Sequence, residues 1–97
     1  MLFFGGKKST EEKTLRGNSS ISIPSRGKVK YKAIDPTDDS RSRGVVAVFT
    51  VDNRGKVDLL EVKTDVFMDG KKLEQGGQIV INKGNVIKIK GYDHTVI

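Results

Sequence analysis

Hydrophobic and polar residues alternate with a period of two in the first part of the chain, which is the pattern of a β-strand buried on one face only. In residues 28–33 the apolar residues take one parity and the lysines take the other. Residues 21–23 alternate isoleucine with serine and are followed by Pro24, which cannot donate a ladder hydrogen bond. The pattern predicts a short edge strand at 21–23 and a half-buried antiparallel strand at 28–34.

The next two apolar runs are longer and hold most of the predicted core. Residues 45–51 form a nearly continuous β-branched and aromatic run, and residues 57–68 follow it after a turn signal at Asn53-Arg54-Gly55. In the second run the apolar positions change parity between Leu59 and Leu60. A change of parity within one strand indicates a β-bulge, and we expect this one to bury both leucines.

Further turn signals divide the rest of the chain into short strands. They are Asp69-Gly70, Gly76-Gly77 and Lys83-Gly84-Asn85, and they leave apolar segments at 79–81, 86–89 and 92–97. About seven short strands at turn spacings of about 8 to 12 residues are typical of a sandwich or a small barrel. We therefore predict an all-β fold, a small antiparallel β-sandwich with a basic N-terminal tail.

Composition divides the chain into a tail at residues 1–20 and a sandwich domain at residues 21–97. The tail shows no sustained periodicity, and its Gly, Lys, Ser, Glu and Asn content is typical of a poorly ordered segment. The chain has 97 residues, enough for one domain. Because it lacks cysteine and any long apolar run, we expect a cytoplasmic protein without a signal peptide or a transmembrane segment.

The net charge of +6 comes entirely from the first third of the chain. Residues 1–34 hold eight Lys or Arg against two Glu, whereas residues 35–97 hold ten residues of each sign. A basic segment on a neutral body favours contact with nucleic acid, an anionic membrane or an acidic partner, and charge alone does not choose among them. The candidate anion-binding or nucleic-acid-binding residues are Arg26, Lys28, Lys30, Lys32, Arg41 and Arg43.

The aromatic residues argue against the nucleic-acid alternative. Proteins that bind single strands place stacking aromatics on the same surface as their basic residues. Here Tyr31 has the opposite parity from its neighbouring lysines, while Phe49 and Phe67 lie in apolar runs. Lysines on the outer face of a small sheet also keep it soluble and discourage pairing between edges. We favour this second interpretation of the lysines.

The first residues form a candidate docking element. Met1 to Phe4 are four adjacent large apolar residues, and Gly5-Gly6 supplies a hinge behind them. We expect this segment to bind a protein partner or a second copy of the chain; the alternative is that it covers an open edge of its own sandwich. The predicted partner-binding residues are Leu2, Phe3, Phe4, Lys7 and Lys8.

Catalytic and metal-binding signatures are missing from the sequence. His94 is the only imidazole and there is no cysteine, so neither a zinc cluster nor a Ser-His-Asp arrangement can be assembled, and we expect His94 on the surface. Asp35, Asp38 and Asp39 lack the spacing of an EF-hand and are predicted to form turns. We predict a non-enzymatic interaction or assembly module without cofactor or metal, with nucleic-acid binding as the alternative.

Two family resemblances cover the second half of the chain. Residues 51–55, followed by residues 62–70, resemble the N-x-G and alternating-valine pattern of immunoglobulin-like sandwiches in adhesion and archaeal surface-filament proteins. This resemblance implies a binding or assembly module. Residues 40–43, 69–73 and 84–87 are similar to the motifs of forkhead-associated domains, which implies phosphothreonine-peptide binding. The sequence departs from that second pattern at Ser25-Arg26, where the family has Gly-Arg, at Arg43, where it has His, and at Asp69, where it has Asn.

Overall fold

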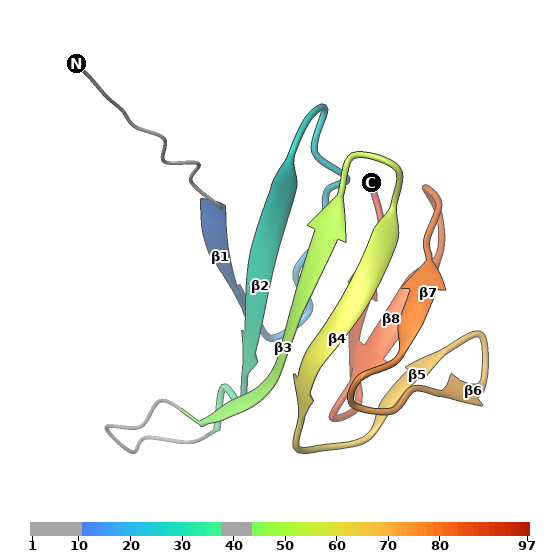
Figure 1. Cartoon of the computed structure of the whole chain (residues 1–97). Coiled ribbons are helices and arrows are strands. Elements are labelled where there is room, and N and C mark those ends of the chain that lie inside the picture. Colours follow the sequence, from blue (N-terminus) through green and yellow to red (C-terminus); the bar gives the residue numbers. More distant parts are fainter. Residues whose placement is uncertain (1–10, 38–43) are drawn as a thin grey trace.

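The structure is a computed structural model that describes residues 11–37 and 44–97. This described part contains nine strands and no helix, and the strands form two sheets that face each other, so the predicted all-β fold is confirmed (Figure 1). The first sheet has the order β1-β2-β3-β4-β7, with β1 Glu11–Arg16, β2 Lys28–Ile34, β3 Val45–Asp52, β4 Lys56–Val62 and β7 Gln78–Val80. The second sheet has the order β6-β5-β8-β9, with β6 Lys71–Lys72, β5 Val66–Met68, β8 Val86–Ile89 and β9 Tyr92–Thr95.

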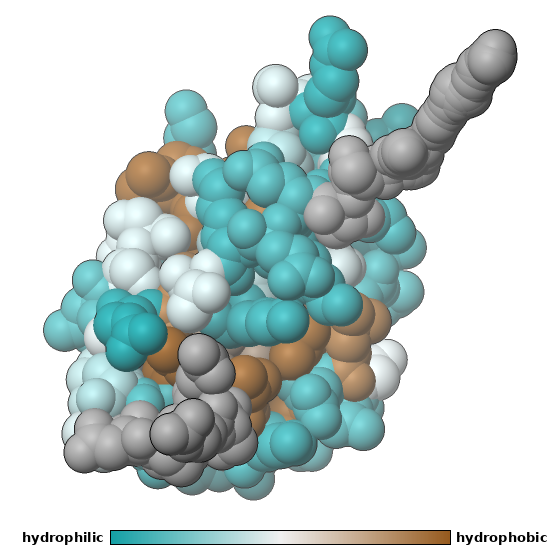
Figure 2. All heavy atoms as spheres, turned by 90° about the vertical axis from the view of Figure 1, so that its left-hand side faces the viewer, coloured by the Kyte–Doolittle hydropathy of each residue, from teal (hydrophilic) through white to brown (hydrophobic). Residues whose placement is uncertain are grey.

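Strand β1 extends the first sheet to Glu11, before residue 21, where we expected the domain to begin. The strand contains a single apolar residue, Leu15, which is buried. It pairs with β2 in parallel, whereas the other strand pairs of both sheets are antiparallel, so the first sheet is mixed at this edge. Charged side chains along an edge strand discourage pairing with another chain. Seen from the β1 side, the surface is mostly hydrophilic, with hydrophobic atoms in a band across its lower half (Figure 2).

A parallel pair of strands needs a crossover connection, and residues 17–27 provide it. Residues 18–21 of this crossover lie along the free edge of β9. The N–H of Ile21 donates to the carbonyl oxygen of Thr95 at 3.0 Å, and the N–H of Ile97 donates to the carbonyl oxygen of Ile21 at 2.9 Å. The predicted edge strand is therefore reduced to one bridge, between Ile21 and Val96. The crossover covers the edge of the second sheet and joins the two sheets.

The core lies between the inward faces of the two sheets. On β2 the predicted alternation is confirmed, because the apolar residues face inward and the lysines face outward. The ring of Tyr31 stacks on Phe49 of the next strand, with 5.4 Å between ring centroids, and Leu59 of β4 is the cross-strand partner of Phe49. The second sheet contributes Val66, Ile87 and Ile89. Burying one such aliphatic side chain contributes about 1.5–3 kcal/mol.

The predicted β-bulge is present between β3 and β4, but it exposes Leu60 instead of burying it. Phe49 lies opposite Leu59, whereas Val48 lies opposite Glu61, so Leu60 is the extra residue on β4. Leu59 is 3% exposed and Leu60 is 50% exposed. The parity change thus falls one position later than expected, and it leaves Leu60 and Glu61 together on the outer face. The expectation that both leucines are buried is wrong.

The other turn signals are confirmed as turns, with one difference in what they connect. Asp69-Gly70 closes the β5–β6 hairpin, and both residues have positive φ angles, 53° and 79°, as a type I′ turn requires. The turn at residues 83–84 joins β7 to β8, which lie in different sheets. Sequence spacing alone does not distinguish a hairpin from a connection between sheets.

Candidate functional site

The outer face of the first sheet carries a groove that follows β3. Two adjoining hollows of about 490 Å³ and about 400 Å³ share Lys30 and Leu60 in their linings, so they form one groove. The register explains its floor, because Thr50 and Val48 are the cross-strand neighbours of Lys30 and Lys32. These two β3 side chains are shorter than the lysines on β2, and the surface is therefore lower along β3.

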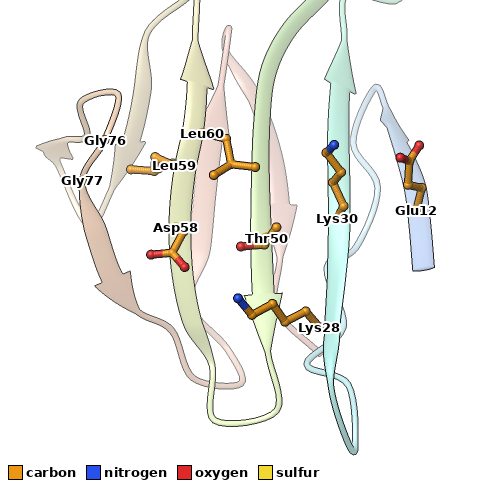
Figure 3. Close-up of a pocket in the computed structure, with 9 residues that line it drawn as sticks. All are labelled: Glu12, Lys28, Lys30, Thr50, Asp58, Leu59, Leu60, Gly76 and Gly77. Carbon is orange, nitrogen blue, oxygen red and sulfur yellow. The ribbon is translucent and has the colours of Figure 1, made fainter. Parts of the chain in front are cut away.

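The two walls of the groove carry opposite charges. A single ladder row crosses all five strands, from Glu12 through Lys30, Thr50 and Asp58 to Gln78. The wall on β2 consists of lysines, whereas the wall on β4 carries two carboxylates and a leucine. Figure 3 shows Lys28 and Lys30 on β2, and Asp58 and Leu60 on β4. The β2 wall contains Lys28, Lys30 and Lys32, and the β4 wall contains Asp58, Leu60 and Glu61.

Leu60 is an exposed apolar side chain among these charges. In Figure 3 its side chain points from β4 toward β3, and the Lys28 side chain reaches across β3 toward β4. A β-bulge adds a residue to one strand and redirects its side chains, which is how this leucine comes to face the groove. Because about half of this side chain stays in water, the fold lacks part of the stabilisation of about 1.5–3 kcal/mol that full burial of a leucine contributes.

Polar contacts fix some of the charged side chains and leave others available. Lys32 Nζ lies 3.4 Å from the Glu12 carboxylate, and the Gln78 side-chain amide donates to Asp58 Oδ1. In the described part of the chain, Lys28 and Lys30 form no ion pair. These two ammonium groups are the cations that the groove offers to a ligand.

The structure brings together only some of the candidate anion-binding residues. Lys28, Lys30 and Lys32 share the groove wall, and Arg26 lies in the turn that precedes β2. Arg41 and Arg43 lie outside the described residues, as does the proposed docking element with Leu2, Phe3, Phe4, Lys7 and Lys8. Tyr31 is buried behind the lysine face, so the predicted separation of this ring from the lysines is confirmed.

His94 is buried, so its predicted surface position is wrong. It is 2% exposed, on the inward face of β9, and its Nδ1 lies 2.8 Å from the carbonyl oxygen of Ser19. Burial lowers the pKa of the imidazole below its usual value of 6.5, against the opposing effects of the Ser19 carbonyl and the Asp93 charge. The histidine is thus a neutral structural residue.

Asp35 confirms the turn-forming role predicted for it. Its Oδ1 accepts hydrogen bonds from the N–H of Thr37 at 2.9 Å and from the Thr37 hydroxyl at 2.6 Å. These hydrogen bonds, together with nearby Lys90, lower the pKa of the carboxyl group. Asp38 and Asp39 lie outside the described residues.

Phe67 occupies a position that the sequence pattern did not reveal. Residues 66–68 belong to an apolar run of the sequence, which indicates a core strand. Val66 is indeed buried, but Phe67 is only partly buried. It lies between Lys72 and Lys88 in the ladder of the second sheet, beside a hollow of about 300 Å³. Each lysine pairs with a carboxylate at 3.6 Å, Lys72 with Asp65 and Lys88 with Asp93. Their charges are therefore partly neutralised within the protein.

Within residues 11–37 and 44–97 there is no group of three or more His, Cys, Asp or Glu side chains that could hold a metal ion. The same part of the chain contains no helix long and apolar enough to cross a membrane.

Comparison with known proteins gave no match: no protein-family model, no curated protein and no solved structure is significantly similar to the chain.

Proposed function

We propose that the chain is a protein-interaction module that binds an extended polypeptide segment in the groove along β3. The observation that carries this proposal is the 50% exposure of Leu60, which lies among the carboxylates of the β4 wall and faces the lysine wall across the groove. Protein interfaces combine an apolar centre that loses water on binding with a polar rim that stays partly wet. A leucine surrounded by lysines and carboxylates has this arrangement.

Charge complementarity defines the partner. An acidic side chain on the bound segment pairs with Lys28 or Lys30, which form no ion pair in the described part of the chain. An apolar side chain of the segment covers Leu60, and a basic side chain faces Asp58 or Glu61. Such pairs at the rim contribute mainly to orientation and to the rate of association.

A peptide library displayed on phage tests the proposal directly. Peptides selected on the immobilised protein are expected to place an apolar residue next to an acidic one, and Leu60→Ser is expected to weaken their binding at least tenfold. Val86→Ser, at an exposed valine on the outer face of the second sheet, is the matched control and should leave binding unchanged. Selected peptides that bind Leu60→Ser as tightly as the parent protein contradict the proposal.

The two family resemblances of the sequence imply alternative functions, and both of these are also binding functions. Residues 69–73 contain the turn of the β5–β6 hairpin and β6, and residues 84–87 include the start of β8, which pairs directly with β5. The two-sheet architecture suits both the immunoglobulin-like and the forkhead-associated family. Phosphopeptide binding stays a second-rank alternative, because residues 40–43, which carry the arginines of that resemblance, lie outside the described residues.

A further inference from the structure

Three turns at one end of the sandwich share a short sequence pattern. Each has Ser or Asn, then a basic residue, then a glycine with positive φ: Ser25-Arg26-Gly27, Asn53-Arg54-Gly55 and Asn82-Lys83-Gly84. The turns are far apart in the sequence, and the first two are followed directly by Lys28 and Lys56. The pattern is visible in the sequence, but only the fold shows that the three turns belong together.

The strand register places the three turns side by side. Lys28 lies opposite Asp52, at the ends of β2 and β3 that face the same way. Lys56 lies opposite Val80, and the N–H of Ile81 donates to the carbonyl oxygen of Gly55 at 2.8 Å, which brings the third turn next to the second. In Figure 1 the connections before β2, between β3 and β4 and after β7 all lie at the upper end of the molecule.

This end of the sandwich carries an excess of positive charge among the residues that the structure describes. Its cations are all exposed: Arg26, Lys28, Arg54, Lys56 and Lys83. The six ion pairs among the described residues involve none of them. The carboxylate in the second turn, Asp52, accepts hydrogen bonds at Oδ1 from the N–H groups of Arg54 and Lys56, at 2.9 and 2.8 Å. These hydrogen bonds and the nearby charges of Lys56 and Arg54 lower the pKa of Asp52, so its single negative charge offsets only part of the positive charge of the five cations.

We propose that this basic end binds the phosphate backbone of nucleic acid. Exposed cations without partners in the protein are the electrostatic mark of a polyanion site. Neighbouring strands are about 4.8 Å apart, so the end of the sheet from β2 to β7 spans about 14 Å, which is wide enough to contact more than one phosphate of a nucleic-acid strand. With backbone contacts alone, binding is not sequence-specific.

The composition of the tips favours nucleic acid over a membrane surface. Interfacial membrane binding needs apolar side chains that enter the lipid in addition to basic ones. The three tips contain only Ser, Asn, Arg, Lys and Gly. The basic end is also separate from the peptide groove, although Lys28 borders both surfaces. Arg54 and Lys83 belong to the basic end alone, and they are therefore the residues to substitute.

Fluorescence anisotropy with a labelled 20-base-pair DNA duplex tests the proposal. The parent protein is expected to bind at about 50 mM salt, with log K falling linearly as log salt concentration rises. Arg54→Gln/Lys83→Gln is expected to weaken binding about tenfold or more at 0.1 M salt and to reduce the magnitude of the salt slope by about 1.8, or about 0.9 for each lost phosphate contact. Both positions are exposed turn residues, so the melting temperature should stay close to that of the parent.

A charge-matched control separates a defined site from net charge. Lys63→Gln/Lys72→Gln removes the same two charges, but from lysines that already pair with Glu61 and Asp65 at 3.4 and 3.6 Å. This variant is expected to retain the parent affinity and slope. An equal loss in both double variants overturns the proposal, as does absence of duplex binding at low salt. Binding of the parent protein to phosphatidylserine vesicles or polyglutamate, but not to DNA, overturns it as well.

Discussion

The Nδ1 atom of His94 lies 2.8 Å from the carbonyl oxygen of Ser19, a residue 75 positions earlier in the chain. A carbonyl oxygen only accepts hydrogen bonds, so Nδ1 carries the proton in this contact. The contact joins β9 to the crossover between β1 and β2. Nearby, the side-chain oxygen of Asn18 accepts from the N–H of Asp93 at 2.9 Å, so the crossover is held to β9 by side chains as well as by its backbone.

Stability is expected to fall below about pH 6.5 because of His94. Its folded-state pKa lies below the usual value of 6.5, so the unfolded chain binds a proton more readily than the folded protein does. The histidine contribution is complete above pH 6.5 and is lost as the pH falls toward the folded-state pKa. Urea unfolding between pH 4.5 and 7.5 measures this effect.

His94→Gln is the comparison for that pH series. Glutamine keeps an amide donor but does not titrate, so this variant should lose the part of the pH dependence below pH 6.5 that comes from His94, while being less stable at neutral pH. Asp35 and Asp52 also have lowered pKa values, and their contributions are lost only as the pH falls through about 3.8 and below. A parent protein with constant stability from pH 7.5 to 4.5 contradicts the buried, neutral state of His94.

Leu59 and Leu60 are expected to respond very differently to truncation. Leu59 is buried against Phe49, so Leu59→Ala should lower the free energy of unfolding by about 2–4 kcal/mol through lost burial and the resulting cavity. Leu60 is half exposed, and Leu60→Ala should change it by no more than about 0.5 kcal/mol. Urea denaturation of both variants measures these changes in the free energy of unfolding. A large loss for Leu60→Ala would mean that the bulge turns this side chain inward.

The sequence predicted β2 with its observed bounds because lysines and apolar residues alternate there without interruption. It did not predict β1, since a strand with only Leu15 buried has no periodicity to detect and depends on pairing with β2. Parity predicted a bulge in this strand but placed it one residue too early, because its position depends on which residue of β4 lacks a partner on β3. The burial of His94 could not be predicted, because the crossover that covers it belongs to a distant part of the chain.

The candidate sites could be predicted from the sequence only in part. The lysine wall of the groove follows from alternation on one strand, whereas its opposite wall requires the order of β3 and β4 in the sheet. Lys28 was among the predicted anion-binding residues, but Arg54, Lys56 and Lys83 were not, because the second half of the chain is neutral on average. Charge summed over a long segment hides a cluster that forms when three turns meet.

Deletion of residues 1–6 is expected to leave the fold intact and to abolish binding through the N-terminal segment. The deletion removes Leu2, Phe3 and Phe4, the apolar residues of the proposed docking element. If this segment binds a partner and not its own sandwich, the melting temperature should stay unchanged. Sedimentation velocity should detect any self-association of the full-length chain and its loss on deletion. A lowered melting temperature in a protein that stays monomeric would instead indicate that the segment covers its own sandwich.

Tyr31→Phe is expected to destabilise the connection between the crossover and the first sheet without disturbing the aromatic stack. The Tyr31 hydroxyl accepts from the N–H of Ser22 at 2.9 Å and donates to the carbonyl oxygen of Ser22 at 3.2 Å. Phenylalanine keeps the ring against Phe49 but leaves both backbone groups of Ser22 without this partner, at a cost of about 1–3 kcal/mol. Urea unfolding measures that cost. Amide hydrogen exchange locates it, because exchange should accelerate at Ser22 and stay unchanged at Phe49 in β3. Unaltered exchange at Ser22 together with unaltered stability would show that the hydroxyl does not hold the crossover in place.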